Sequence, residues 1–246
     1  MGHDLGHSPF GHAGEKALDE IYNHYVPEEN FRHYEQSLRV VDFIEKKNGL
    51  NLTYEVRMGI LNHSKGRSCL NFDDNCNEES TLEGEIVRIS DRVAYINHDI
   101  DDAMRAGIIK FEDIPKDCSD ILGNTLTKRI NTMVMDIINN SIDQPRIIMS
   151  ETINNAVEKL KEFMFENVYL NSPAKTEEIK AEELLKTLYK YYMDHPEFLP
   201  EFLVAKGFDL DDTKQRARAV LDYVSGMTDG YALYSYQNIF IPKGWI

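Results

Sequence analysis

The sequence has few cysteines and no long apolar run. Its 246 residues include three cysteines, Cys69, Cys76 and Cys118, an odd and sparse number that argues against a disulfide framework. No window approaches the roughly 18 continuous apolar residues of a membrane span. The first residues lack the basic start and the apolar stretch of a signal peptide. We therefore expect a cytoplasmic protein with no membrane partner.

Positive charge is also scarce, since the formal net charge is −15. Proteins that bind the nucleic-acid backbone use clustered Lys and Arg, so nucleic acid is not expected as the main partner. A small anionic substrate is still compatible with this charge, because a local pocket can be basic or carry a metal within an acidic protein. Any phosphate chemistry must therefore be local.

Prolines are few and β-branched runs are short, which favours helices. There are eight prolines, and apolar residues recur at spacings of three and four. The pattern predicts an all-α fold, with a polar loop over Gly66–Ser80. Eight helices are predicted besides the one discussed next: Glu15–Tyr25, Arg32–Lys47, Thr53–Asn62, Ser119–Ile142, Ser150–Asn167, Thr176–Met193, Asp211–Ser225 and Asp229–Phe240.

The clearest predicted helix is Leu82–Arg105. One side carries an apolar stripe from Leu82 to Met104. At about 100° per residue, the other side carries charged and polar residues that share one face. These residues are Arg88, Asp91, Arg92, Tyr95 and Asp99. The residues alone leave two interpretations open, a functional face or a solvated face with Arg88–Asp91 and Arg92–Asp99 ion pairs.

Histidine is concentrated at the start of the chain. Five of the eight histidines lie within the first 33 residues, and three of them lie in HDLGHSPFGHAGE, residues 3–15. The interspersed glycines suit a tight turn in which the backbone approaches a ligand closely. The adjacent His3 and Asp4 would offer a metal ion one nitrogen and one oxygen ligand. This pattern indicates a metal-binding turn.

The same string is similar to the signature of the deoxynucleoside triphosphate (dNTP) triphosphohydrolases, the dGTPase-type branch of the HD superfamily. Four later segments also resemble that family, in the same order: FRHYEQSLRVV, LNLTYEVRMGILNHSKG, TLEGEIVRISDRVAYINHDIDDA and DYVSGMTDGYALYSY. The resemblance covers most of the chain. It implies an HD-domain helical fold, with an HD core over residues 1–145 and a C-terminal helical region over residues 146–246 packed on that core.

The resemblance implies a divalent metal ion, for which Mn²⁺, Mg²⁺ and Fe²⁺ each suit a His/Asp site. Family members hold it with an upstream histidine, the HD pair and a distant aspartate. His3 and Asp4 match the pair, and Asp91 matches the distant aspartate. The family's first histidine lies tens of residues upstream of the pair. We therefore expect the HD core to be incomplete at its N-terminus, with three of the family's four metal ligands remaining.

The implied reaction is hydrolysis of a dNTP, with dGTP favoured, to deoxynucleoside and tripolyphosphate. His12 matches the family's catalytic histidine, and Glu15, three residues on, is expected to face it and orient its ring. His12 would act as general acid toward the departing 5′-oxygen, and a nucleophilic or base role is the competing view. His7 and His33 match histidines near the phosphates.

The resemblance also assigns substrate contacts. Arg92 matches a phosphate contact, Tyr95 a residue whose ring excludes a 2′-hydroxyl, and Asp99 the acceptor for the 3′-hydroxyl. Lys65 is expected to add a phosphate contact together with His63.

Two alternatives remain beside this enzyme. One is another HD phosphohydrolase. Simpler HD enzymes need only the metal ligands, so the presence of His12 and Glu15 argues against this alternative. The other is a nucleotide-binding regulatory or scaffold protein without turnover. Family members often assemble, so a homo-oligomer is expected.

Overall fold

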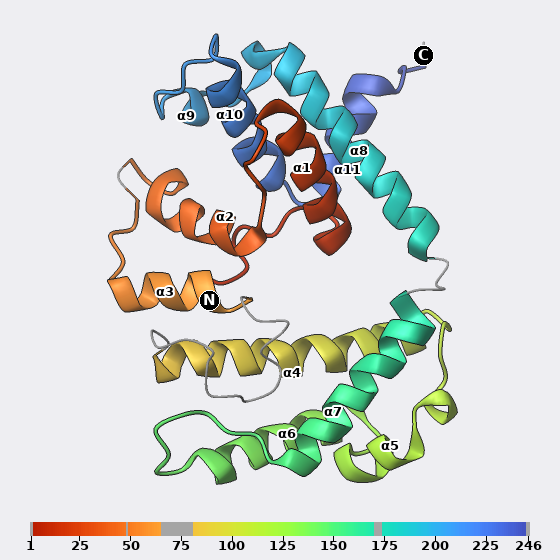
Figure 1. Cartoon of the computed structure of the whole chain (residues 1–246). Coiled ribbons are helices and arrows are strands. Elements are labelled where there is room, and N and C mark those ends of the chain that lie inside the picture. Colours follow the sequence, from red (N-terminus) through yellow and green to blue (C-terminus); the bar gives the residue numbers. More distant parts are fainter. Residues whose placement is uncertain (1, 48, 65–80, 170–173, 245–246) are drawn as a thin grey trace. The chain divides into compact units, whose positions relative to one another are not determined.

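The computed structural model describes residues 2–47, 49–64, 81–169 and 174–244 (Figure 1). All regular elements in these ranges are helical, which confirms the predicted all-α fold. The chain divides into two compact units: unit 1 comprises Met1–Leu61 and Thr176–Ile246, and unit 2 comprises Asn62–Lys175. The predicted domains, 1–145 and 146–246, follow family segments rather than these units and remain a prediction.

Unit 1 is built around the packing of α1 on α8 and α10. Its core contains Leu18 and Tyr22 from α1, Leu185 and Tyr189 from α8, and Val220 from α10, each at most 1% exposed. Full burial of one such side chain contributes roughly 1.5–3 kcal/mol. The elements are α1 (Gly11–Tyr25), α2 (His33–Arg39), the π-helical turn η1 (Val40–Ile44), α3 (Tyr54–Asn62), α8 (Ala174–Asp194), η4 (Pro196–Phe198), α9 (Glu201–Val204), α10 (Thr213–Ser225) and α11 (Asp229–Phe240).

Unit 2 packs α4 against α6 and α5 against α7. Its core includes Ile100, Leu122, Met133 and Leu160, all fully buried. The helices α4, α6 and α7 each begin at a Ser or Thr whose side chain accepts a backbone N–H of the first turn. The elements are α4 (Leu82–Arg105), η2 (Phe111–Asp113), α5 (Lys116–Leu122), α6 (Leu126–Ser141), α7 (Glu151–Met164) and η3 (Phe165–Tyr169).

Several predicted helix bounds differ from those of the structure. The single helix predicted over Ser119–Ile142 is wrong, because the chain breaks at Gly123, which has a φ of 110°. Helix α1 begins at Gly11, four residues before its predicted start, after a left-handed residue, Phe10. Among the described helices, none is both long enough and apolar enough to cross a membrane.

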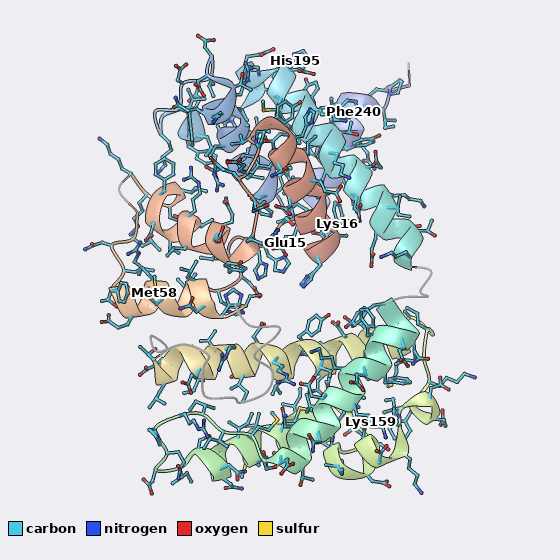
Figure 2. All side chains as sticks on the ribbon, in the orientation of Figure 1. Glu15, Lys16, Met58, Lys159, His195 and Phe240 are labelled. Carbon is cyan, nitrogen blue, oxygen red and sulfur yellow. The ribbon has the colours of Figure 1, made fainter. Side chains whose placement is uncertain are left out.

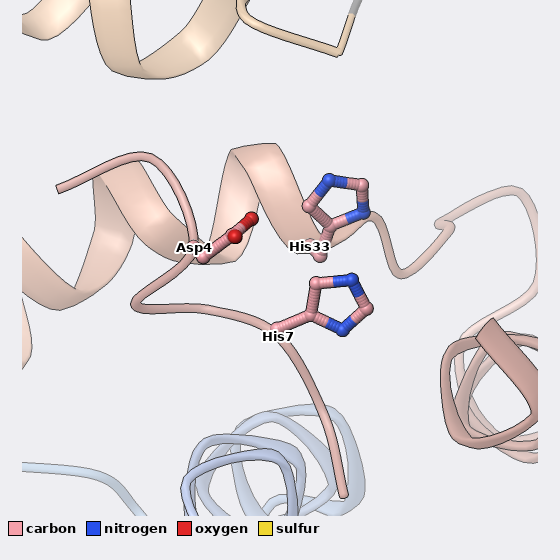
Figure 3. A group of neighbouring side chains, drawn as sticks. All are labelled: Asp4, His7 and His33. Atoms are coloured by element: carbon pink, nitrogen blue, oxygen red, sulfur yellow. The ribbon is translucent and has the colours of Figure 1, made fainter. Parts of the chain in front are cut away.

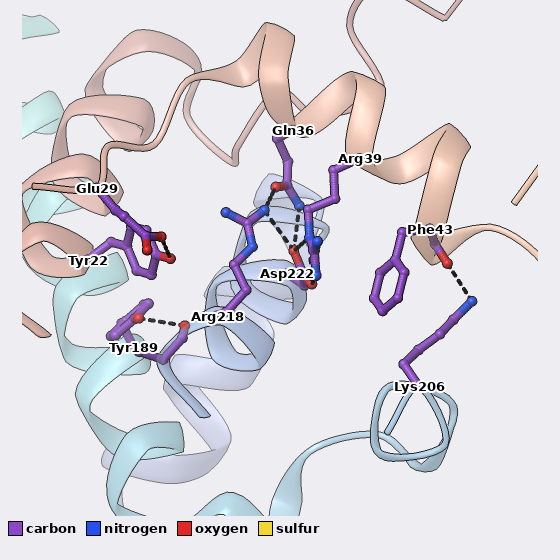
Figure 4. Close-up of polar contacts among 10 residues, drawn as sticks. Tyr22, Glu29, Gln36, Arg39, Phe43, Tyr189, Lys206, Arg218 and Asp222 are labelled. Carbon is purple, nitrogen blue, oxygen red and sulfur yellow. Dashed lines mark hydrogen bonds and ion pairs between the residues drawn. The ribbon is translucent and has the colours of Figure 1, made fainter. Parts of the chain in front are cut away.

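A buried carboxylate joins α2 to α10 (Figure 4). The Asp222 side chain is fully buried and accepts hydrogen bonds from Arg39 Nε and Nη2, at 2.8 and 2.7 Å to its two oxygens. Gln36 Nε2 donates at 3.0 Å and Arg218 Nη2 at 3.1 Å. Four donor atoms satisfy this charge, and removing one partner of such a buried pair typically costs about 3–5 kcal/mol. The network fixes α2, which carries residues of the candidate site.

Candidate functional site

The signature segment, residues 3–15, forms tight turns that lead into α1. A Cβ atom on Gly6 would lie 2.1 Å from the backbone nitrogen of Ser37 on α2. A Cβ atom on Gly14 would lie 1.8 Å from the carbonyl oxygen of Pro9. Side chains cannot be accommodated at such distances, so these two glycines allow the segment to lie directly against α2 and against its own preceding turn.

Three histidines of unit 1 form one cluster. The rings of His7 and His33 stack with centroids 4.6 Å apart, and His12 lies 5.6 Å from His7 and 6.3 Å from His33. Burial, and then the nearby His33, lower the pKa of His7 below its ordinary value. The predicted grouping of these histidines therefore forms within a single unit, where α1 supplies His12, α2 supplies His33 and the signature turn supplies His7.

Glu15 bonds to His33. That Glu15 also orients His12 stays a prediction. Its carboxylate contacts His33 Nδ1 at 3.0 Å and accepts the His33 backbone N–H at 3.0 Å. Burial alone would raise the pKa of Glu15, but the bonds from His33 and the charges of His33 and His12 outweigh it and hold the pKa at about 2. Figure 2 shows Glu15 beside Lys16 on α1. Lys16 forms an ion pair with Glu182 of α8 and not with the neighbouring Glu15.

His3 and Asp4 present adjacent donor atoms, with 3.1 Å between His3 Nε2 and Asp4 Oδ2. Two ligands that bind one metal ion at about 2.1 Å and at right angles are about 3 Å apart, so the pair fits a shared coordination shell. Asp4, His7 and His33 also offer ligand atoms within 4.8 Å of one another (Figure 3). Unit 1 therefore contains donor groups suited to a divalent ion. Asp91, the third predicted ligand, lies on α4 in unit 2.

The polar face of α4 makes contacts that the sequence did not predict. Arg92 pairs with Glu158 of α7, so its partner is not Asp99. Asp99 instead accepts a hydrogen bond from the hydroxyl of Tyr169 in η3. Burial, and then that bond, raise the pKa of Tyr169 well above its usual value. Sequence reasoning missed Tyr169 because a tyrosine beyond the end of a predicted helix carries no spacing signal toward a residue 70 positions earlier.

Of the remaining predicted substrate residues, Tyr95 and His63 lie among the described residues. Tyr95 lies on α4 with 47% of its surface exposed, which leaves its ring accessible to a ligand. His63 is buried in unit 2. Lys65, the predicted loop Gly66–Ser80 and the pair Cys69 and Cys76 lie outside the described residues.

Comparison with known proteins gives consistent results. A family profile described as a phosphohydrolase-associated domain matches residues 147–238. A deoxyguanosinetriphosphate triphosphohydrolase-like protein of Caldanaerobacter subterraneus subsp. tengcongensis is 48% identical over 246 residues, covering 100% of this chain and 67% of the relative. Proteins of the same description from Clostridium perfringens and Desulfatibacillum aliphaticivorans are 42% and 39% identical, with 99% and 98% of this chain and 68% and 69% of each relative covered.

Proposed function

We propose that this chain, which belongs to the deoxyguanosinetriphosphate triphosphohydrolase-like family of HD phosphohydrolases, hydrolyses deoxynucleoside triphosphates, with dGTP favoured. Water attacks the α-phosphorus, and the bond from that phosphorus to the 5′-oxygen breaks. The products are a deoxynucleoside and intact tripolyphosphate. The 5′-oxygen would leave as an alkoxide, a poor leaving group, so a proton donor is needed at this atom.

The observation that carries the proposal is the histidine cluster beside the His3–Asp4 pair. In a protein of net charge −15, three imidazole rings within 6.3 Å of one another gather hydrogen-bond donors at one place. A metal site alone needs no such cluster, whereas a triphosphate has many oxygens to bind and a leaving oxygen to protonate.

His3 and Asp4 would hold the divalent ion, with Asp91 as the further ligand that the family resemblance assigns. When bound, the ion would polarise a phosphoryl oxygen and lower the pKa of a water molecule. The 3.1 Å separation of the His3 and Asp4 donors supports this assignment. These ligand types suit Mn²⁺, Mg²⁺ and Fe²⁺ alike.

The other residues bind and transfer a proton. His12, at the second position of α1, would donate the proton to the 5′-oxygen. Glu15 would hold the His33 ring in one orientation through Nδ1, so that the other edge of this ring is available to phosphate oxygens. His7 would contribute a further phosphate contact. These roles require the histidines to act together, which their clustering supports.

The face of α4 would bind the nucleotide. Arg92 would contact a phosphate, and Tyr95 would exclude a 2′-hydroxyl by its bulk. Asp99 would accept the 3′-hydroxyl, and its bond with Tyr169 supports this role because it keeps the carboxylate in a defined orientation. Lys65 would add a phosphate contact.

Product analysis tests the proposal. The full chain is incubated with Mn²⁺ and each dNTP, and the phosphate species are separated by anion exchange. Tripolyphosphate with free deoxynucleoside is the expected result. Pyrophosphate or orthophosphate would assign the protein to another kind of HD phosphohydrolase. Nucleotide binding without any turnover would favour a regulatory or scaffold role.

A further inference from the structure

Ser37 of α2 makes two hydrogen bonds to the segment that carries the proposed metal ligands. The residue is fully buried and follows His33 by one helical turn. Its hydroxyl oxygen accepts the backbone N–H of Gly6 at 2.9 Å, and its proton is donated to the carbonyl oxygen of His3 at 2.5 Å. A single hydroxyl therefore joins the two ends of the four-residue stretch that contains both His3 and Asp4.

The turn that follows the His3–Asp4 pair is also closed by a backbone hydrogen bond. The N–H of His7 donates to the carbonyl oxygen of Asp4 at 3.1 Å, so the chain reverses directly after the His–Asp pair. Gly6 lies so close to α2 that an added Cβ would be 2.5 Å from the carbonyl oxygen of His33. This close approach brings the Gly6 N–H within reach of a side chain as short as serine.

The helix that carries Ser37 is itself fixed. Its neighbours Gln36 and Arg39 both donate to the buried Asp222 carboxylate of α10 (Figure 4). A rigid helix that supports a short turn sets the positions of the side chains on that turn. Removal of a group that orients metal ligands commonly weakens metal binding by about 10- to 100-fold.

We infer that Ser37 is a positioning residue for the metal ligands His3 and Asp4, an inference that rests on the proposed function. Without the hydroxyl, the Gly6 N–H and the His3 carbonyl would have to find other partners in a buried region, and the turn would gain freedom. The spacing of 3.1 Å between the His3 and Asp4 donors would then no longer be held. The competing view is that Ser37 only fills space in the core.

The test compares Ser37→Ala with a matched control, Ser225→Ala. Ser225 is a serine of the same unit with 1% exposure, and its hydroxyl makes no hydrogen bond among the described residues. Mn²⁺ binding to the full chain is measured by electron paramagnetic resonance without nucleotide. We expect the dissociation constant to rise about tenfold or more in Ser37→Ala and to change less than about twofold in Ser225→Ala. Equal affinities in the two variants would overturn the inference.

Ser37→Cys separates hydrogen bonding from packing. A thiol fills at least the space of the hydroxyl but is a weak donor and a weak acceptor. We expect this variant to bind Mn²⁺ as poorly as Ser37→Ala. Wild-type affinity in Ser37→Cys would show that Ser37 acts by filling space, and would overturn the inference.

Hydrogen exchange gives a readout that does not depend on metal. In metal-free protein, the peptide that spans residues 2–12 should exchange faster in Ser37→Ala than in the wild type, and Ser225→Ala should leave it unchanged. Unchanged exchange in Ser37→Ala would show that the hydroxyl does not hold the turn. If the wild type bound no Mn²⁺, the metal part of the proposed function would fail, and the exchange result would still decide whether Ser37 holds the turn.

Discussion

His12 is the residue whose proposed role is most directly tested by substitution. It lies at the start of α1, and its ring is 5.6 Å from that of His7. If His12 protonates the 5′-oxygen, His12→Ala should lower kcat by about 10²- to 10⁴-fold, while the KM for dGTP changes little. Steady-state kinetics with purified variants measure both constants.

A matched control lies on the same helix. His24 is exposed near the end of α1, and its substitution by alanine should leave kcat unchanged. A kcat close to that of the wild type in His12→Ala would remove His12 from the chemistry. A rise in KM with an unchanged kcat would instead make it a substrate-binding residue.

Tyr22 gives a prediction about pH. Burial, and then a 2.6 Å bond from its hydroxyl to Glu29, raise the pKa of Tyr22 to about 12. The folded state favours the protonated phenol and so gains stability from it. This contribution to the free energy of unfolding is complete below the unfolded pKa of about 10 and is lost as the pH rises toward 12. The stability advantage of the wild type over Tyr22→Phe should therefore fall by about 1 kcal/mol between pH 9 and pH 11. Urea unfolding at both pH values measures it, and a constant difference would contradict the shift.

The sequence names candidate site residues where the signal is local, and their functional roles stay predictions. The signature string itself points to His3, Asp4, His7 and His12, because imidazole, carboxylate and glycine are gathered within a few positions. Pairings between distant segments could not be predicted in this way. Helical spacing predicts only that Glu15 faces His12, whereas the chain folds back and also places the backbone and ring of His33, 18 positions away, against Glu15.

At the scale of elements, α4 is the helix whose face carries the proposed nucleotide contacts. Tyr95 projects from it with 47% of its surface exposed. If its ring excludes the 2′-hydroxyl, Tyr95→Ala should raise the kcat/KM for GTP relative to dGTP by about tenfold, since a lost steric conflict of that size is worth about 1.4 kcal/mol. Competition between the two nucleotides measures the ratio.

Two further variants of α4 serve as controls for Tyr95→Ala. Tyr95→Phe keeps the ring and should keep the discrimination, whereas Ile86→Ala alters an exposed apolar residue of the same helix and should have no effect. An unchanged GTP to dGTP ratio in Tyr95→Ala would refute the role of the ring.

Helices could be predicted where the apolar spacing is continuous, and their interruptions could not. The bounds of α4 and α11 agree with those predicted, because each has a capping Thr and an unbroken pattern. The break at Gly123 was missed because a single glycine is tolerated in many helices. Here Gly123 adopts a φ of 110°, which is not helical, so α5 ends before it. A Cβ at this position would lie 2.7 Å from Cβ of Lys128, so only glycine fits there.

At the scale of the whole molecule, the described residues form two buried apolar clusters, and the proposed metal ligands belong to neither. The buried clusters of unit 1 and unit 2 consist of aliphatic, aromatic and sulfur-containing side chains. In unit 1, His3 and Asp4 keep 25% and 51% of their side-chain surfaces exposed. Family and fold class followed from sequence patterns, whereas the division into Met1–Leu61 with Thr176–Ile246 and Asn62–Lys175 did not, because it depends on which helices meet in space.

This separation of core from site predicts that activity and folding respond differently to metal removal. Treatment with EDTA should abolish dNTP hydrolysis, while helicity measured by circular dichroism stays constant and Tm falls by no more than a few degrees. Proteins whose fold depends on a metal ion unfold when it is chelated, because the binding energy is part of the folding energy. Here the two cores supply that energy through buried apolar surface. Adding Mn²⁺ back should restore turnover without refolding, and a cooperative loss of helicity in EDTA would show instead that the ion holds the structure together.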